Sequence, residues 1–424
     1  MSLRRFGTAL FALALLSGSW FDAAAQSVPV AGEARALPES AGKVAAASPD
    51  GTKFAVVLPG RALCIVESAS LQELGCASIA DAGITVGLDS VSWSPDSSRL
   101  VFAEMGFTLG NDSDLWLMDA ATGSLTNLTD DGYAGSISDL DTDATTSPTF
   151  SVDTSPAWTP DGLRISFART GYVDGRSTGT VLASIPASGG PVEELTRLSE
   201  QEPGVVAFRS AWSPNGATLY YSRLGSLLLD EDDGVWAYDA ASGETRPIAT
   251  YGGSNLGAPA LLQVSPRGDT LLVGYPTAMR NFTLTETLVH LVDLHTGELA
   301  PPRMPLVAPT AFRGLTQATY SPDGSAMLLL IDGAEEHQNE LWTLDLATNE
   351  RTLLLDDVPD PLYEVGIGPS WGANGTAVIG LRHGGALVTE IIGIGLVSSD
   401  VLRPAIDRGV AAHLGSAPTT AAPQ

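Results

Sequence analysis

The sequence has few cysteines, few histidines and few basic residues. Two cysteines and five histidines occur in 424 residues, and 22 lysines and arginines stand against 49 aspartates and glutamates, so the formal net charge is −27. Nucleic acids and anionic membrane surfaces are poor partners, because their phosphates would meet a strongly negative field. The acidity favours solubility and fits three explanations: a salty habitat, a cationic ligand or a basic partner.

Long apolar runs are also lacking beyond the N-terminal region, so we expect no membrane span. The first 25 residues have the three parts of a secretory signal peptide: Arg4 and Arg5, an apolar run over residues 10–16, and alanines at 23–25. The apolar run is too short for a membrane anchor. We therefore predict a signal peptide over residues 1–25 and a monomeric protein that is periplasmic or secreted.

The two cysteines, Cys64 and Cys76, flank a stretch that reads as two strands around a turn near Ser70. An even number of cysteines in an oxidising compartment indicates a disulfide, which would staple a hairpin here. The alternative is a pair of buried free thiols. We predict the disulfide.

The most informative feature that is present is a short turn, which returns seven times. In its clearest copies Ser or Thr is followed by Pro, then Asp or Asn, then Gly. The copies lie at residues 48–51, 94–97, 159–162, 213–216, 265–268, 321–324 and, in a decayed form, 372–375. Successive copies are 46 to 65 residues apart, which suits one propeller blade per copy. A single blade cannot bury both of its faces, so the copies must stack on one another.

Each complete copy predicts four short strands separated by turn residues. The second copy has them at residues 92–93, 99–103 and 114–119, with a last segment that ends at 128–129. An aromatic residue precedes most of the repeated turns. We expect these aromatic residues to pack between neighbouring blades rather than to bind sugars; they are Trp93, Trp158, Trp212, Tyr320 and Trp371.

These features together predict an all-β fold. We expect a single β-propeller over residues 43–400 with seven four-stranded blades, and six or eight blades are the alternatives. Residues 26–42 form an N-terminal segment, in which 28–36 can supply a closing strand to the weak last blade. Residues 401–424 are rich in Ala, Pro and Thr, and we expect this tail to be largely disordered.

The repeat resembles that of the TolB-like β-propellers, a WD40-like repeat family in which Ala-Trp-Ser-Pro-Asp-Gly precedes an apolar strand. Residues 157–162 and 211–216 match this pattern closely. The resemblance covers roughly residues 40 to 400 and implies the propeller fold, but it does not specify function. The family's namesake also has an N-terminal α/β domain. Only about twenty residues separate the expected cleavage site from the first repeat, so we expect that domain to be missing.

The loops expected after the second and fourth strands of the blades are long, and all of them lie on one face. They are residues 106–113, 129–155, 170–179, 224–234, 251–258, 277–285 and 333–339. Insertions on one face of a repeat array often mark the binding face. Acidic residues in these loops form the predicted ligand-binding set: Asp112, Asp114, Asp139, Asp141, Asp143, Asp230, Asp232 and Asp233.

The alternation of Asp139, Asp141 and Asp143 is a pattern that can bind Ca²⁺, a hard cation that prefers oxygen ligands. An EF-hand loop would need Gly and Glu at the positions that hold Ala144 and Phe150. Two interpretations remain, a bound Ca²⁺ and simple solvation of an acidic loop. No cofactor is required by the sequence.

Motifs for catalysis are weak. Two Gly-x-Ser-x-Gly matches, at residues 175–179 and 368–372, lack the strand-turn-helix context of a nucleophile elbow. The five histidines show no metal-binding spacing, although propeller enzymes gather ligands from several blades. We expect a non-catalytic scaffold of the cell envelope that binds a protein or envelope ligand, cationic in nature, through its acidic loops. The alternative is a metal-dependent hydrolase or lyase with its ligands around the central channel.

Overall fold

The computed structural model describes 27 β-strands and no helix among the residues that it places. The described residues are 43–58, 62–67, 72–79, 84, 91–104, 112–133, 149–174, 176–199, 209–223, 234–250, 261–280, 283–295, 299–300, 315–332, 338–348, 350–359, 370–371, 377–382 and 389–394. The predicted signal peptide, the segment 26–42 and the tail 401–424 lie outside them, so these three predictions stay untested. No helix in the described part is long and apolar enough to cross a membrane.

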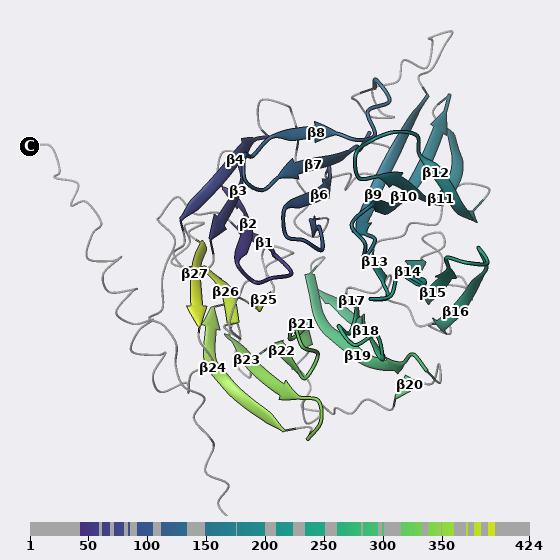
Figure 1. Ribbon diagram of the computed structural model, residues 1–424. Coiled ribbons are helices and arrows are strands. Elements are labelled where there is room, and N and C mark those ends of the chain that lie inside the picture. Colours follow the sequence, from purple (N-terminus) through teal and green to yellow (C-terminus); the bar gives the residue numbers. More distant parts are fainter. Residues whose placement is uncertain are drawn as a thin grey trace, which may run out of the picture.

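The strands form antiparallel sheets, each built from consecutive strands, and Figure 1 shows the sheets side by side around a common centre. Blade one contains β1 (Lys43–Ala47), β2 (Lys53–Leu58), β3 (Ala62–Glu67) and β4 (Glu73–Ser78). Blade two contains β5 (Ser92–Trp93), β6 (Arg99–Ala103), β7 (Leu115–Asp119) and β8 (Leu125–Asn127). Blade three contains β9 (Phe150–Trp158), β10 (Arg164–Val173), β11 (Arg176–Pro186) and β12 (Glu193–Ser199).

The next three blades repeat this plan. Blade four contains β13 (Ser210–Trp212), β14 (Thr218–Arg223), β15 (Gly234–Asp239) and β16 (Thr245–Thr250). Blade five contains β17 (Leu261–Val264), β18 (Thr270–Arg280), β19 (Thr283–Asp293) and β20 (Leu299–Ala300). Blade six contains β21 (Leu315–Tyr320), β22 (Ala326–Asp332), β23 (Gln338–Asp345) and β24 (Arg351–Pro359).

The last sheet has three described strands, β25 (Ser370–Trp371), β26 (Ala377–Arg382) and β27 (Thr389–Ile394). The all-β propeller is therefore confirmed, but the prediction of seven four-stranded blades needs correction: six blades have four strands. The seventh copy is the one whose turn has Gly372 and Ala373 in place of Ser and Pro. Its expected closing strand, residues 28–36, lies outside the described residues.

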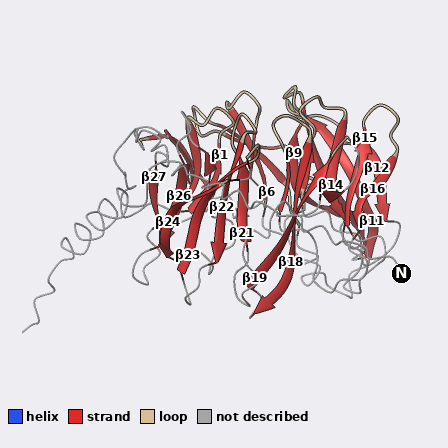
Figure 2. Ribbon diagram, turned by 90° about the horizontal axis from the view of Figure 1, so that it is seen from below, coloured by secondary structure: helices blue, strands red, loops and turns tan. Residues whose placement is uncertain are grey.

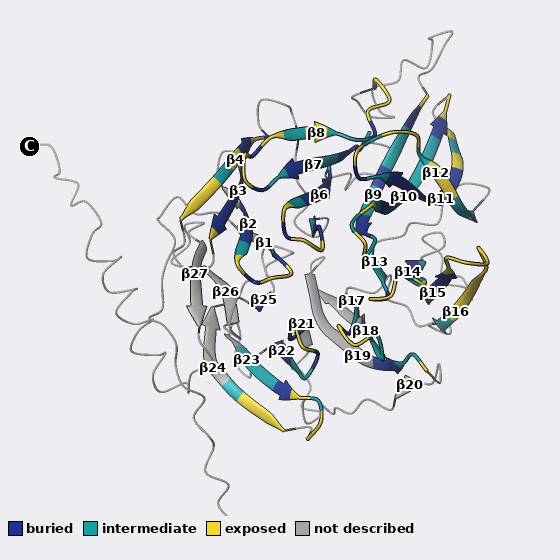
Figure 3. Ribbon diagram, in the orientation of Figure 1, coloured by how far each residue is buried: buried dark blue, intermediate teal, exposed yellow. Residues whose placement is uncertain are grey.

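The core lies between neighbouring blades, because each sheet buries apolar side chains against the next. Leu63 and Ile65 of blade one, for example, pack in one cluster with Leu100 and Phe102 of blade two. Similar clusters join blades two to three, three to four, four to five, and five to six. Figure 3 shows the same gradient within the described blades, with buried inner strands and more exposed outer strands.

The aromatic residues before the turns link neighbouring blades, as the sequence predicts. Trp93 Nε1 donates a hydrogen bond to Ala46 O of blade one at 3.2 Å, and Trp158 Nε1 donates to Ser92 O of blade two at 3.1 Å. Three further links have the same direction along the chain: Trp212 Nε1 to Ser166 Oγ, Tyr320 Oη with Thr270 Oγ1, and Trp371 Nε1 to Thr319 O. These side chains therefore serve the scaffold.

The repeated turns pack on one another on the face opposite the long loops. Figure 2 draws the described turns in tan along the upper rim of the ring. Gly162 has a φ of 69°, and a Cβ at this position would lie 3.7 Å from Pro95 Cδ of the preceding turn. The same contact joins Gly216 to Pro160, Gly268 to Pro214 and Gly324 to Pro266. From the third to the sixth copy, each turn thus rests on the Pro of the turn before it.

Two of the predicted long loops are strands for most of their length. Residues 170–179 belong mainly to the hairpin of β10 and β11, and residues 277–285 belong mainly to the hairpin of β18 and β19. Figure 2 shows β18 and β19 reaching beyond the other strands on the lower face. Thr170 and Thr180 explain the first case, since their β-branched side chains favour strands and their hydroxyls are hydrogen-bonded across the pair at 2.8 Å.

The disulfide prediction is confirmed. Cys64 on β3 and Cys76 on β4 are bonded through their sulfur atoms and are direct partners in the strand register. The interpretation as two free thiols is wrong.

Candidate ligand-binding site

The structure places two of the eight predicted site residues. Asp112 and Asp114 lie on the face of the long loops, immediately before β7. The other six fall outside the described residues: Asp139, Asp141, Asp143, Asp230, Asp232 and Asp233. The proposed Ca²⁺ pattern at residues 139–143 is therefore not tested.

Ser113 holds this segment against blade three. It forms an isolated parallel bridge with Val152, and its backbone O accepts a hydrogen bond from Asp153 N at 2.8 Å. Its hydroxyl proton is shared between two acceptors, Glu104 O at 3.0 Å and Asp153 O at 2.9 Å from Oγ. Because side chains alternate along extended backbone, Asp112 and Asp114 project to the same side of Ser113.

An ion pair forms one side of the site. Asp153 on β9 and Arg169 on β10 are direct register partners, and Arg169 donates from Nε to Oδ1 at 2.7 Å and from Nη2 to Oδ2 at 2.6 Å. The Asp153 side chain is 1 % exposed. Burial raises the pKa of Asp153 to about 6, although the hydrogen bonds and positive charge of Arg169 act in the opposite direction.

Asp114 and Glu104 are held by neutral donors. Asn127 Nδ2 donates to Asp114 Oδ2 at 2.7 Å, and Thr129 Oγ1 donates to Asp114 Oδ1 at 3.3 Å. Trp116 Nε1 donates to Glu104 Oε1 at 2.6 Å. Burial is the main reason that the pKa values of Asp114 and Glu104 are raised.

Asp112 differs from these residues because one of its oxygens has no donor. Its Oδ1 atom is buried and has no hydrogen-bond partner among the described residues. Burial raises the pKa of Asp112 to about 8, and the negative charges of Asp114, Asp131, Glu104 and Asp153 add to the effect. A carboxyl group with this pKa is largely protonated at neutral pH until a cation stabilises its ionised form.

Aromatic rings lie beside the carboxylates. Phe150 is stacked between Tyr133, at a centroid distance of 4.8 Å, and Tyr172, at 4.9 Å. Asp131 connects this stack to the site, because it accepts hydrogen bonds from Tyr133 N at 3.1 Å and Ser151 N at 2.6 Å. We call the five carboxyl residues the acidic cluster: Glu104, Asp112, Asp114, Asp131 and Asp153.

The set of site residues predicted from the sequence does not include Glu104, Asp131, Asp153 or Arg169. Glu104 follows directly after the apolar strand β6, and Arg169 follows the buried residues Phe167 and Ala168 within β10. A charged residue next to or within a buried strand indicates a candidate site residue, since such charges are rarely buried without a partner.

Comparisons with known proteins identify the architecture. Oligogalacturonate lyase from Vibrio parahaemolyticus has 12 % sequence identity and a TM-score of 0.53, over 88 % of this chain and 95 % of that chain. A structure of oligogalacturonate lyase in complex with manganese has 12 % identity and a TM-score of 0.58, over 87 % and 98 %. TolB from Acinetobacter baumannii has 13 % identity and a TM-score of 0.41, over 86 % and 79 %.

The chain has a β-propeller fold. At these identities the likeness shows the fold alone. No protein-family model matches the sequence, and the search of curated proteins also gives no match.

Proposed function

We propose that this protein is an exported, monomeric, seven-bladed β-propeller that acts as a non-catalytic scaffold and binds a cationic group of an envelope protein at the acidic cluster. The seventh sheet counts as a blade in this proposal. The observation that carries the proposal is the buried Oδ1 atom of Asp112, which has no donor in the described part of the chain. Burial and, after it, four neighbouring carboxylates raise the pKa of the same group.

The charge balance of the cluster favours a cation. Arg169 is the cation paired with Asp153, and the remaining described contacts of Asp114, Asp131 and Glu104 come from neutral donors. Two unit charges about 4 Å apart near a protein surface attract by on the order of 4 kcal/mol. A ligand cation next to Asp112 would therefore shift that group toward its ionised form and supply the missing donor.

An ammonium or guanidinium group fits the cluster better than a bare metal ion. Seven of the ten carboxylate oxygens of the acidic cluster accept a described hydrogen bond, and Oδ1 of Asp112 is a buried oxygen without one. Ca²⁺ takes about 6–8 oxygen ligands, whereas an N–H donor needs a single acceptor in the right direction. Tyr133 adds an aromatic ring, and cations bind favourably over such rings.

Titration of the full-length protein with a short arginine-containing peptide tests this proposal. We expect measurable binding that weakens with added salt, since exposed charges are screened within about 10 Å at 0.1 M. Asp112→Asn should weaken binding about tenfold, a change of about 1.4 kcal/mol. Asp174→Asn is the matched control, because it makes the same substitution at an exposed position with a φ of 52°, which Asn tolerates. Equal binding by the Asp112→Asn variant would contradict the proposal.

The alternative function is that of a metal-dependent hydrolase or lyase with ligands around the central channel. Its support is the fold shared with the manganese complex of oligogalacturonate lyase. Among the described residues, the group of three potential metal ligands within mutual reach is Cys64, Glu73 and Cys76, which belong to blade one. Metal analysis after incubation with Mn²⁺, followed by an assay on oligogalacturonate, distinguishes the two functions: bound Mn²⁺ together with cleavage would favour the enzyme.

A further inference from the structure

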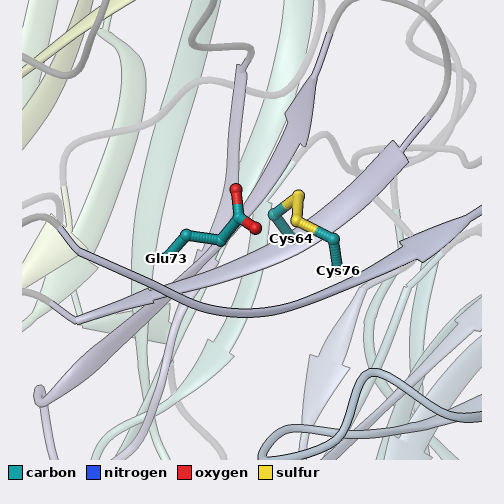
Figure 4. Close-up of side chains that lie close together, drawn as sticks. All are labelled: Cys64, Glu73 and Cys76. Carbon is teal, nitrogen blue, oxygen red and sulfur yellow. A yellow bond between two sulfur atoms is a disulfide. The ribbon is translucent and has the colours of Figure 1, made fainter.

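The disulfide of blade one has a carboxylate beside it. Figure 4 shows the side chain of Glu73 directed toward the sulfur atoms of Cys64 and Cys76. One ligand atom from each of these three residues lies within 4.8 Å of the other two. Two cysteine sulfurs and one carboxylate oxygen form a donor set that zinc accepts in proteins.

A register shift in β4 is the reason that Glu73 faces the cysteines. Residues three positions apart in a regular strand point to opposite faces of the sheet. Here Cys64 pairs with Cys76, Ile65 with Gly75, and Val66 with Glu73, so one residue, Leu74, is left without a partner. The extra residue turns Glu73 to the face of Cys76.

The backbone of β4 is fixed from blade two, independently of the disulfide. Gly123 lies in the turn between β7 and β8, and a Cβ at this position would lie 2.5 Å from Cys76 O. A Cβ on Gly75 would lie 3.2 Å from Gly123 N. Cys64 is fully buried within β3, which pairs with β2 on its other side. Both sulfur positions are therefore set by packed strands, and the strands hold them opposite each other after reduction.

We propose that reduction of the disulfide between Cys64 and Cys76 by a dithiol converts blade one into a Zn²⁺ site, with the two thiolates and Glu73 as ligands and water in the fourth position. The dithiol attacks the disulfide, the sulfur–sulfur bond breaks, and the reductant leaves as its own cyclic disulfide. Two electrons and two protons pass to the cysteines. Zn²⁺ then binds both sulfurs and displaces the two thiol protons to solvent.

The oxidised protein has no such site, because disulfide sulfurs carry no negative charge. Reduction supplies two sulfurs that can bind a divalent cation as thiolates, beside the carboxylate of Glu73. The site is therefore controlled by the redox state.

The test uses the full-length protein, reduced with a dithiol and freed of reductant under anaerobic conditions. Zinc is titrated in competition with a chromogenic chelator, and cadmium provides a second readout through its sulfur-to-metal charge-transfer absorption. We expect one equivalent of zinc and a cadmium–thiolate signal in the reduced protein only. Circular dichroism of the reduced protein before metal addition should match that of the oxidised protein.

Glu73→Gln should weaken zinc binding about tenfold or more, since changes even outside the ligand shell cost about 10–100-fold. Glu67→Gln is the matched control, because it removes the same charge at the end of β3. The proposal is overturned by equal zinc binding in the oxidised protein, by an unchanged affinity in the Glu73→Gln variant, or by loss of the strand signal on reduction.

Discussion

Arg169 and Asp153 face each other across β10 and β9 and share two parallel hydrogen bonds, at 2.7 and 2.6 Å. The pair lies where blade three meets the segment of Ser113, and the carboxylate that neutralises Arg169 is itself a member of the acidic cluster. Asp153 thus has a structural role beside the carboxylates to which the proposed function assigns binding.

Loss of Arg169 should destabilise the fold. In the Arg169→Met variant, Asp153 would remain almost fully buried without its cation. Breaking a buried ion pair in this way lowers the free energy of unfolding by about 3–5 kcal/mol. Urea denaturation measures the loss. The double variant with Asp153→Asn should recover part of it, because the uncompensated charge is removed; a double variant that is less stable than Arg169→Met alone would contradict this account.

Stability should fall as the pH rises from about 4 toward 8 through the contributions of Asp112 and Asp153. Their folded pKa values, about 8 and about 6, lie above the ordinary value of 3.8. The folded protein therefore holds protons that the unfolded chain has released, and unfolding becomes easier as the pH increases through this window. Denaturation curves of the wild type and of Asp112→Asn should converge toward pH 4 and separate toward pH 8, with the variant more stable.

Cation binding should show the opposite pH dependence, because a cation binds the ionised form of Asp112. The affinity for the arginine-containing peptide should increase as the pH rises toward 8, and bound peptide should lower the pKa of Asp112. Proton release on binding, measured by calorimetry in buffers of different ionisation enthalpy, checks this. Binding without proton release near neutral pH would exclude Asp112 as the recognised group.

The repeated turns should lose stability in acid. Asp96 accepts hydrogen bonds from Ser94 Oγ at 2.6 Å and Ser98 Oγ at 2.7 Å, which lower its pKa to about 2. A depressed folded pKa means that the stabilisation is present above the ordinary value near 3.8 and is lost as the pH falls toward 2. Asp50 and Asp323 behave in the same way.

Blade four contains the natural control for these turns. Asn215 occupies the Asp position and accepts hydrogen bonds from Ser213 Oγ at 2.7 Å and Ala217 N at 3.0 Å, without a charge. Asp96→Asn should therefore be tolerated at neutral pH and should reduce the loss of stability between pH 4 and 2. Acid titrations followed by circular dichroism measure the difference, and an unchanged acid transition would mean that Asp96 does not contribute.

Gly123 should tolerate alanine much less well than Gly243, its counterpart in blade four. Both residues have positive φ values, 71° and 74°. A Cβ on Gly123 would lie 2.5 Å from Cys76 O, whereas a Cβ on Gly243 has no described neighbour within 4 Å. Gly243→Ala should lower the free energy of unfolding by about 1–2 kcal/mol through its backbone conformation alone. Gly123→Ala should lower it by about 1–3 kcal/mol more, because the added methyl group would be too close to Cys76 O. Equal losses in urea denaturation would show that β4 can move.

The propeller scaffold can be predicted from the sequence better than the acidic cluster, and the repeated turns explain why. Ser94, Pro95 and Asp96 act within a few residues of one another, so their pattern reports the local structure directly. The pairing of Asp153 with Arg169 depends on the register of β9 and β10, which no single stretch of sequence displays. Residues 170–179 are predicted as a loop although they form strands, because they lack the apolar alternation of a half-buried strand.

The contact between neighbouring turns has a direction: from the third to the sixth copy, the Gly of one turn rests on the Pro of the turn before it. Each of these units therefore offers a Pro to the blade after it and a Gly to the blade before it. Duplication or deletion of one such unit would again bring a Gly onto a Pro at the new junction. At the level of these turns, the gain or loss of one of these blades would need no new type of contact.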